Sequence, residues 1–164
     1  MLVGVLSDTH GRLPRTAYAE LADCGHIIHA GDICDPGILD ELRTLADVTA
    51  VLGNNDYSEY GLAVGRFARP VIEGVRFLVT HTPRDLAMAL HGGLGVLSPG
   101  DPLPHVAIHG HTHVPKLETG HAASPAGWLL CPGSVSRPRG GSHACLAKVE
   151  IANGMVAGVR FYDV

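Results

Sequence analysis

Short apolar runs that end abruptly in polar residues alternate with helical patterns over the first third of the chain. Leu2–Leu6, His26–Ala30 and Val48–Leu52 are such runs, and their length is typical of buried strands. A helix is predicted over Pro14–Cys24, where proline suits the first turn, and a second helix begins at Asp35-Pro36. The order strand–helix–strand–helix–strand predicts parallel pairing with right-handed crossovers.

The second half of the chain is predicted to consist mostly of strands. One further helix is expected over Pro83–His91, followed by a loop over Gly92–Pro104 that is rich in glycine and proline. The dipeptide Asn153-Gly154 is typical of a two-residue hairpin turn between the last two strands. Together these patterns predict one α/β domain over residues 1–164, with an antiparallel C-terminal half. Strands are expected at Val75–Thr80, Val106–His109, Val114–Thr119, Gly127–Cys131, His143–Ile151 and Met155–Tyr162.

Composition narrows the class of protein. Apolar residues form 46% of the 164 positions, which excludes a mainly disordered chain, and the net charge of −4 argues against a protein that coats nucleic acid or anionic membrane. No run approaches the roughly 18 apolar residues of a membrane span. The opening residues lack the basic and long apolar regions of a signal peptide. We therefore expect a cytoplasmic protein that does not bind membranes.

Polar side chains gather where the predicted strands end. Because ligands in open α/β sheets bind outside the carboxyl ends of the strands, these side chains are expected at one edge of the molecule. They are carboxylates, a carboxamide and imidazoles without sulfur, a set that favours Mn²⁺, Fe, Co, Ni or Zn²⁺ over Ca²⁺. Seven ligands are too many for one ion, so two ions are predicted. The candidate ligands are Asp8, His10, Asp32, Asn54, His81, His111 and His113.

The motifs Asp8-x-His10, Gly31-Asp32, Gly53-Asn54-x-Asp56, His81 and Gly110-His111-x-His113 together resemble the signature of the calcineurin-like metallophosphoesterases. The string Gly110–Pro115 and the later Pro132-Gly133-Ser134 are similar to the small bacterial phosphodiesterase branch, the YfcE-like proteins. This resemblance implies a four-layer α/β/β/α sandwich, in which helices flank two facing mixed β-sheets.

The resemblance also implies how the ions are held. One ion would be bound by Asp8, His10, Asp32 and His113, and the other by Asp32, Asn54, His81 and His111, with Asp32 bridging. A hydroxide between the two ions would attack phosphorus in line. The implied cofactors are two divalent metal ions, with Mn²⁺ the first choice and Fe, Ni, Co or Zn the alternatives.

The chain departs from the family pattern at Asn55. Many members carry a histidine there, which stabilises the transition state or protonates the leaving oxygen, and asparagine has no titratable proton. Asn55 is expected to act at the catalytic site and on the substrate through hydrogen bonds. Asp56, which orients that histidine in the pattern, is the second candidate catalytic residue and is expected to brace the loop. Arg12 and Arg137 are candidates for binding substrate phosphate, and Arg139 is a further one.

The leading hypothesis is a dinuclear-metal phosphodiesterase that acts on a small phosphate ester. A phosphomonoesterase and a dinucleoside-polyphosphate hydrolase are alternative activities that the sequence leaves open. The alternative from a different functional class is a protein-interaction scaffold that keeps the fold with weak or no catalysis. The complete set of candidate metal ligands argues against a scaffold. A dedicated nucleic-acid partner is not expected, because a net charge of −4 provides no basic track. A homo-oligomer is compatible with the sequence.

Overall fold

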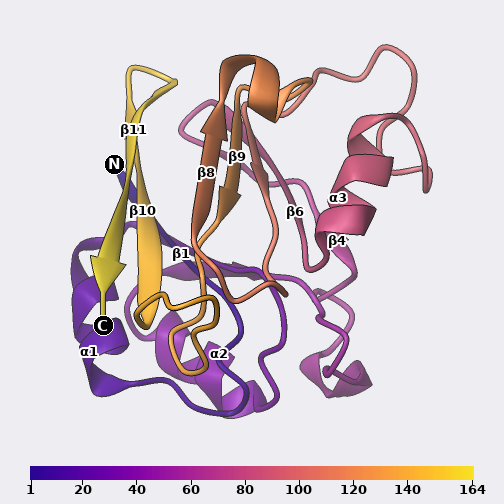
Figure 1. The fold of residues 1–164 in the computed structure, drawn as a ribbon. Coiled ribbons are helices and arrows are strands. Elements are labelled where there is room, and N and C mark those ends of the chain that lie inside the picture. The colour runs from indigo at the N-terminus through magenta and orange to yellow at the C-terminus, as the bar shows by residue number, and fades with distance from the viewer.

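The first of two β-sheets contains the parallel strands that the N-terminal pattern predicts. The structure is a computed structural model that describes residues 1–164, apart from the side chain of Ser58. Strands β1, β2 and β3 pair in parallel, and β10 joins them to the C-terminal strand through antiparallel pairing. The sheet runs in the order β11 (Met155–Asp163), β10 (Cys145–Ala152), β1 (Leu2–Leu6), β2 (His26–His29), β3 (Asp47–Ala50) (Figure 1).

The second sheet is also mixed. Its strands β6, β7 and β9 are parallel, while β4, β5 and β8 pair antiparallel with their neighbours. The sequence did not predict β4 and β5, because two residues are too few to show an alternating pattern. The order is β4 (Phe67–Ala68), β6 (Val75–Thr80), β7 (Val106–Ile108), β9 (Trp128–Cys131), β8 (Lys116–Thr119), and β5 (Val71–Ile72) pairs with β6.

Helices cover the outer faces of both sheets, so the predicted four-layer architecture is confirmed. Helix α1 (Arg15–Glu20), continued by a 3₁₀ turn, and α2 (Pro36–Arg43) pack on the first sheet, and α3 (Pro83–Leu90) packs on the second (Figure 1). Asp35 caps α2 by accepting a hydrogen bond from the Gly37 amide, as its position before a proline predicts. Short 3₁₀ turns occupy Leu21–Asp23, Ser58–Tyr60 and Gly120–Ala123. Among the helices described, none is long and apolar enough to cross a membrane.

A core of branched aliphatic side chains fills the space between the sheets. Val5, Ile28, Val79 and Ile108 are among its fully buried members, and the partly buried Trp128 packs against it. Burial of this kind stabilises the sheets by roughly 1.5–3 kcal/mol for each large aliphatic side chain. The facing sheets therefore form a rigid base for the loops at their carboxyl ends.

Hydrogen bonds beyond the strand ends bring the polar loops together. The amide of Asp8 donates to the Gly31 carbonyl at 3.0 Å, and the amide of Gly110 donates to the His81 carbonyl at 2.9 Å. The backbone hydrogen bonding of each sheet thus continues beyond the strand ends into the loops that follow. The polar clusters of the two sheets meet at one edge, as the sequence analysis predicted.

Candidate metal centre

Two carboxylates lie between two pairs of histidines at this edge. The rings of His10 and His113 are 5.1 Å apart between centroids, and those of His81 and His111 are 5.2 Å apart. Asp8 and Asp32 occupy the space between the pairs. Asn54 joins the second pair, since its Oδ1 lies 2.9 Å from Nδ1 of His111. All seven candidate ligands predicted from the sequence therefore come together.

Each carboxylate faces both histidine pairs. Oδ1 of Asp8 lies 3.1 Å from Nε2 of His113 and 3.9 Å from Nε2 of His81. The two oxygens of Asp32 point in different directions: Oδ2 is 3.7 Å from Nε2 of His10, and Oδ1 is 3.5 Å from Nε2 of His81. Two groups of donors, Asp8–His10–His113 and Asp8–Asp32–His81, each lie within 4.8 Å of one another. This spacing lets a carboxylate serve two cations.

Left-handed backbone conformation is concentrated at the candidate ligands. Side chains with a Cβ avoid this region, and departures of this kind cluster at functional sites because the surrounding structure must hold them in place. At Asp8, the hydroxyl of Ser134 donates to the backbone carbonyl at 2.8 Å, and this hydrogen bond helps to hold the left-handed conformation in place. The ligands with positive φ are Asp8 (55°), His10 (46°), Asp32 (55°), His111 (69°) and His113 (60°).

Two glycines allow the loops to approach closely. A methyl group on Gly53 would overlap the carboxylate and backbone of Asp32, and one on Gly110 would overlap the hydroxyl of Ser7. That hydroxyl in turn donates to Asp8, as does the amide of His111 at 3.0 Å. Glycine at these positions is thus required by the packing of the site itself.

The buried side chains fit a cation. Nδ1 of His81 is 2.8 Å from the Ala30 carbonyl and Nδ1 of His113 is 2.6 Å from the Arg137 carbonyl, so in each ring Nδ1 donates and Nε2 is left as an acceptor. Among the side chains described, Oδ1 of Asp8 and Nε2 of His81 are buried without any hydrogen bond. Buried polar atoms rarely stay unpaired, and a metal ion satisfies both of these.

The charge states of the site also suit metal binding. Burial alone would raise the pKa of Asp32, but the imidazole of His81 and the backbone amide of Asn55 hold that pKa well below its usual range. Burial lowers the pKa of His10 and outweighs the nearby carboxylates. At neutral pH the site therefore presents an ionised carboxylate and a neutral imidazole, which are the forms that bind metals.

Asn55 contacts a metal-ligand candidate directly. Its side-chain Nδ2 donates to Oδ2 of Asp32 at 2.6 Å, and its backbone amide donates to Oδ1 of Asp32 at 2.9 Å. The sequence analysis expected Asn55 to act on the substrate. The structure places its amide on Asp32, where it positions this carboxylate, and a contact with substrate stays a prediction.

Asp56 braces the loops, as expected, while its assignment as a catalytic residue stays a prediction. Its Oδ1 accepts from the Cys34 amide at 2.8 Å and the Tyr60 hydroxyl at 3.0 Å, and its Oδ2 accepts from the amides of Ile33 and Gly53 at 3.1 and 2.8 Å. Both oxygens accept two hydrogen bonds each, so the carboxylate ties the loop after β2 to the loop after β3. The sequence spacing could not show which donors surround it.

Asn55→Ala is expected to weaken Mn²⁺ binding by about tenfold or more, because loss of a group that orients a ligand typically costs 10–100-fold in metal affinity. Isothermal titration calorimetry of the metal-free protein measures this. His121→Ala, in the exposed 3₁₀ turn Gly120–Ala123, serves as the control. Equal affinities for Asn55→Ala and the unaltered protein would show that the contact with Asp32 does not support the site.

Two further histidines near the site are not free to react. His29 is fully buried: its Nδ1 accepts from the Gly31 amide at 3.2 Å, and its Nε2 is 3.0 Å from the Thr9 hydroxyl. Burial lowers the pKa of His29 to about 4. His109 is also buried, with Nδ1 2.9 Å from the Gly110 carbonyl. Both act as supports for the loops that carry the ligands.

A cavity of about 350 Å³ opens beside the second histidine pair. It is lined by Asn54 and His81 on one side and by Arg66 and Asp85 on the other. Arg66 and Asp85 form a two-point ion pair, with contacts of 2.7 and 3.1 Å. The sequence analysis did not identify this pair, since the two residues come from different elements with no shared motif.

Comparison with known proteins relates the chain to a family. Residues 1–154 match the family model for the calcineurin-like phosphoesterase superfamily domain. A probable metallophosphoesterase of Methanothermobacter thermautotrophicus is 37% identical over 147 residues, which cover 85% of this chain and 80% of that protein. A phosphodiesterase of Methanocaldococcus jannaschii is 30% identical over 131 residues, covering 69% of this chain and 74% of that protein.

Solved structures share the fold. The phosphoesterase Yfce from E. coli superposes with a TM-score of 0.63 at 25% identity, covering 92% of this chain and 88% of that one. Vps29 from Entamoeba histolytica, in a complex with zinc, superposes with a TM-score of 0.71 at 20% identity, covering 100% and 98% of the two chains. The second likeness is one of fold alone.

Proposed function

Because the chain belongs to the calcineurin-like phosphoesterase superfamily, we propose that it is a metal-dependent phosphoesterase, and more specifically a phosphodiesterase. The observation that carries the proposal is the convergence of seven nitrogen and oxygen ligands on a site with two unpaired buried atoms. The diesterase assignment is supported by the phosphodiesterase from M. jannaschii.

The ligands divide into two sets that share Asp32. His10, His113 and Asp8 complete the first set, and Asn54, His81 and His111 complete the second. Mn²⁺ suits this mixture of imidazole, carboxylate and carboxamide. Two bound ions would supply Lewis-acid chemistry, both activating water for attack on phosphorus and neutralising the phosphoryl oxygens. The chain keeps Asp32 ionised and fixes the donor atoms of His81 and His113 through backbone carbonyls.

The surroundings of the centre fit a phosphate ester. Arg137 is exposed on the loop whose carbonyl holds His113, and its charge acts on the neighbouring His10. Arg12 is exposed next to the first ligand pair. We assign both to substrate phosphate, because a guanidinium can bind two phosphate oxygens at once. The cavity beside His81 has room for the organic part of the ester.

The second candidate function is that of a protein-interaction scaffold with weak or no catalysis. The observation that favours it is the similarity of this fold to that of Vps29. Against it stands the cost of gathering two buried carboxylates beside four imidazoles, two of them buried, without a cation. The two functions differ in what they require: a scaffold needs the surface of the fold, while a hydrolase needs every ligand.

Removal of metal is expected to abolish hydrolysis of bis(p-nitrophenyl) phosphate, and Mn²⁺ is expected to restore it. The thiol of Cys34 lies 3.9 Å from Nδ1 of His10, but burial raises the pKa of this thiol to about 11, so it is a poor nucleophile at neutral pH. The measurement is the release of nitrophenolate by protein treated with chelator and then dialysed, before and after addition of Mn²⁺. Full activity in metal-free protein would contradict the proposal. A protein that binds Mn²⁺ tightly without hydrolysing mono- or diesters would favour the scaffold.

A further inference from the structure

We propose that the natural substrate carries a second phosphate group, which binds to a basic strip beside His10 and His113. The strip consists of Arg12, Arg15, Arg137 and Arg139, all of which are exposed. The inference rests on the proposed function and adds a substrate class to it: phosphodiesters that bear at least one further phosphate within a few bonds of the reacting one.

The two loops that carry the strip are bonded to each other. The hydroxyl of Ser136 lies 3.0 Å from the carbonyl of Asp8 and 2.8 Å from that of Thr9. The hydroxyl of Ser134 donates to the same Asp8 carbonyl and accepts from the Arg137 amide at 2.9 Å. Residues 8–9 and 134–137 therefore lie side by side at the edge of the metal centre, and the segments that carry the arginines, 9–16 and 132–144, continue from this junction.

The second of these loops is also tied to a metal-ligand candidate. Besides the contact between Nδ1 of His113 and the Arg137 carbonyl, the amide of Arg139 donates to the His113 carbonyl at 3.2 Å. Ser142 closes the turn through its hydroxyl, 2.6 Å from the Arg139 carbonyl. The backbone of Arg137 and Arg139 is thus held at a fixed position next to His113. From there their side chains are within reach of a phosphate that extends from the centre.

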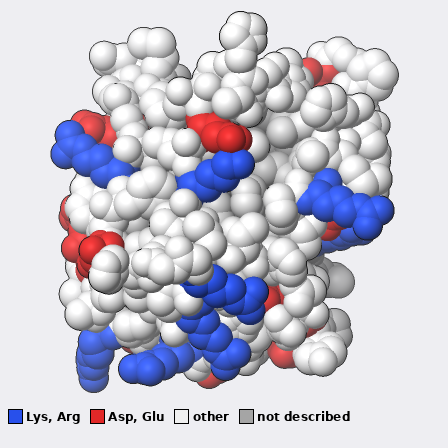
Figure 2. All heavy atoms as spheres, viewed as in Figure 1, with Lys and Arg blue, Asp and Glu red and all other residues white. Residues whose placement is uncertain are grey.

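The strip has no internal counter-charge. Residues 9–16 and 132–144 contain no aspartate or glutamate, and the adjoining Asp8 is a buried metal-ligand candidate. None of the four arginines forms an ion pair with any side chain that the structure describes. Of the other six arginines, Arg43, Arg66 and Arg69 are each paired with an aspartate, and the remaining three lie on other elements. Figure 2 shows basic side chains gathered at the lower end of the molecule, where these loops lie. Since the chain as a whole carries −4, this surface is a local reversal of charge that attracts anions.

The opposite side of the centre differs in charge. There the cavity next to His81 is closed by Arg66, which Asp85 neutralises. A substrate would therefore direct its anionic end toward the strip and an uncharged group into the cavity. The strip spans only two short loops on an acidic protein, which favours a small substrate with two or three phosphates over a nucleic-acid strand. This revises the sequence-based expectation that the protein has no basic track.

Two nucleotides that differ by one phosphate test the inference. We expect thymidine 3′,5′-bisphosphate to bind the full-length Mn²⁺-loaded protein at least tenfold more tightly than thymidine 5′-monophosphate, as measured by calorimetry with equal Mn²⁺ in both solutions. Arg137→Ala/Arg139→Ala should reduce this preference to less than threefold, and Arg137→Lys/Arg139→Lys should restore part of it. The preference should also shrink as salt is raised.

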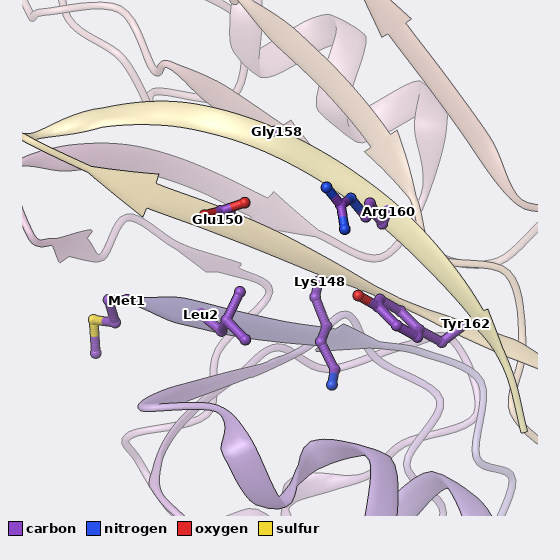
Figure 3. A pocket seen from close by; sticks show the side chains of 7 residues that line it. All are labelled: Met1, Leu2, Lys148, Glu150, Gly158, Arg160 and Tyr162. Atoms are coloured by element: carbon purple, nitrogen blue, oxygen red, sulfur yellow. The ribbon is translucent and has the colours of Figure 1, made fainter.

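Arg160→Ala is the matched control, because it removes an arginine elsewhere. Arg160 lines a separate pocket of about 340 Å³ with Lys148 and Tyr162, on the outer face of β10 and β11 (Figure 3). This variant should keep the full preference. An equal loss in Arg160→Ala would show that net charge alone is responsible and would overturn the inference.

Two other results would also overturn it: equal binding of the two nucleotides, or affinity that keeps rising with the length of a single-stranded oligonucleotide, which would identify a strand as the ligand. Hydrolysis of bis(p-nitrophenyl) phosphate is measured separately on the same samples. If hydrolysis is metal-dependent and the bisphosphate preference is absent, only the strip has been assigned wrongly. If the preference is present and hydrolysis is absent, the proposed function fails and the anion site stands.

Discussion

Asp32→Asn should lower kcat/KM for bis(p-nitrophenyl) phosphate by about 10³-fold or more, the effect of losing several kcal/mol of metal-dependent stabilisation. The two oxygens of Asp32 face different histidine pairs, and its charge offsets two dications. The substitution preserves size, removes the charge and replaces one of the two acceptor oxygens, both of which accept from Asn55, with an amide donor. Elemental analysis should find less metal than in His10→Ala, which alters one set of ligands.

Asp35→Asn provides a matched control three residues away. Asp35 is exposed and caps α2, and asparagine caps helices about as well as aspartate does. This variant should keep its metal and its activity. If Asp32→Asn also retained two ions at full occupancy, Asp32 would not be shared between the sets. Asp8, which lies within 4 Å of histidines in both pairs, would then be the remaining shared carboxylate.

A steep dependence of kcat on leaving-group acidity is the second large effect expected. Asn55 has no proton to transfer and its amide is bonded to Asp32, while His29 is buried with both nitrogens occupied. Leaving oxygens therefore depart without a protein acid, and general acid catalysis is typically worth about 10²–10⁴-fold. The kcat for nitrophenyl diesters should therefore exceed the kcat for alkyl diesters by more than the roughly 10²–10⁴-fold that a general acid would contribute.

A series of aryl and alkyl phosphodiesters at saturating Mn²⁺ measures the slope, under conditions in which chemistry limits turnover. Asn55→His introduces a proton donor and should flatten the slope in part. The flattening is expected to be incomplete, because Asp56 is already occupied by four donors and cannot orient the imidazole. A shallow slope in the unaltered protein would mean that another group supplies the proton.

The sequence predicted the parallel strands and the candidate metal ligands because both depend on local patterns, while the four layers followed from the family resemblance. Asp8 and Asp32 follow short apolar runs, and parallel strands bring their carboxyl ends to one edge, so order along the chain is enough to place them together. His81 follows β6 of the second sheet, and it meets them because the two sheets face each other. The helix beginning at Asp35-Pro36 and the turn at Asn153-Gly154 were predicted from capping and turn chemistry. The structure confirms both, with positive φ at Asn153 and Gly154.

What the sequence could not predict depends on contacts between distant segments. The roles of Asn55 and Asp56 follow from which donors surround Asp32 and the loop after β3, and no spacing encodes that. The serine hydroxyls that join residues 9–16 to 132–144 act across more than 120 positions. For the same reason the net charge gave no sign of the basic strip: four arginines become one surface only when these loops meet.

Titration of metal-free protein with Mn²⁺ tests the two-ion centre most directly. Calorimetry gives the number of ions bound, and the rate of bis(p-nitrophenyl) phosphate hydrolysis is followed over the same additions. The account predicts two ions per chain, with activity that appears only as the second is bound. Binding that ends at one ion per chain, with full activity at that point, would contradict it.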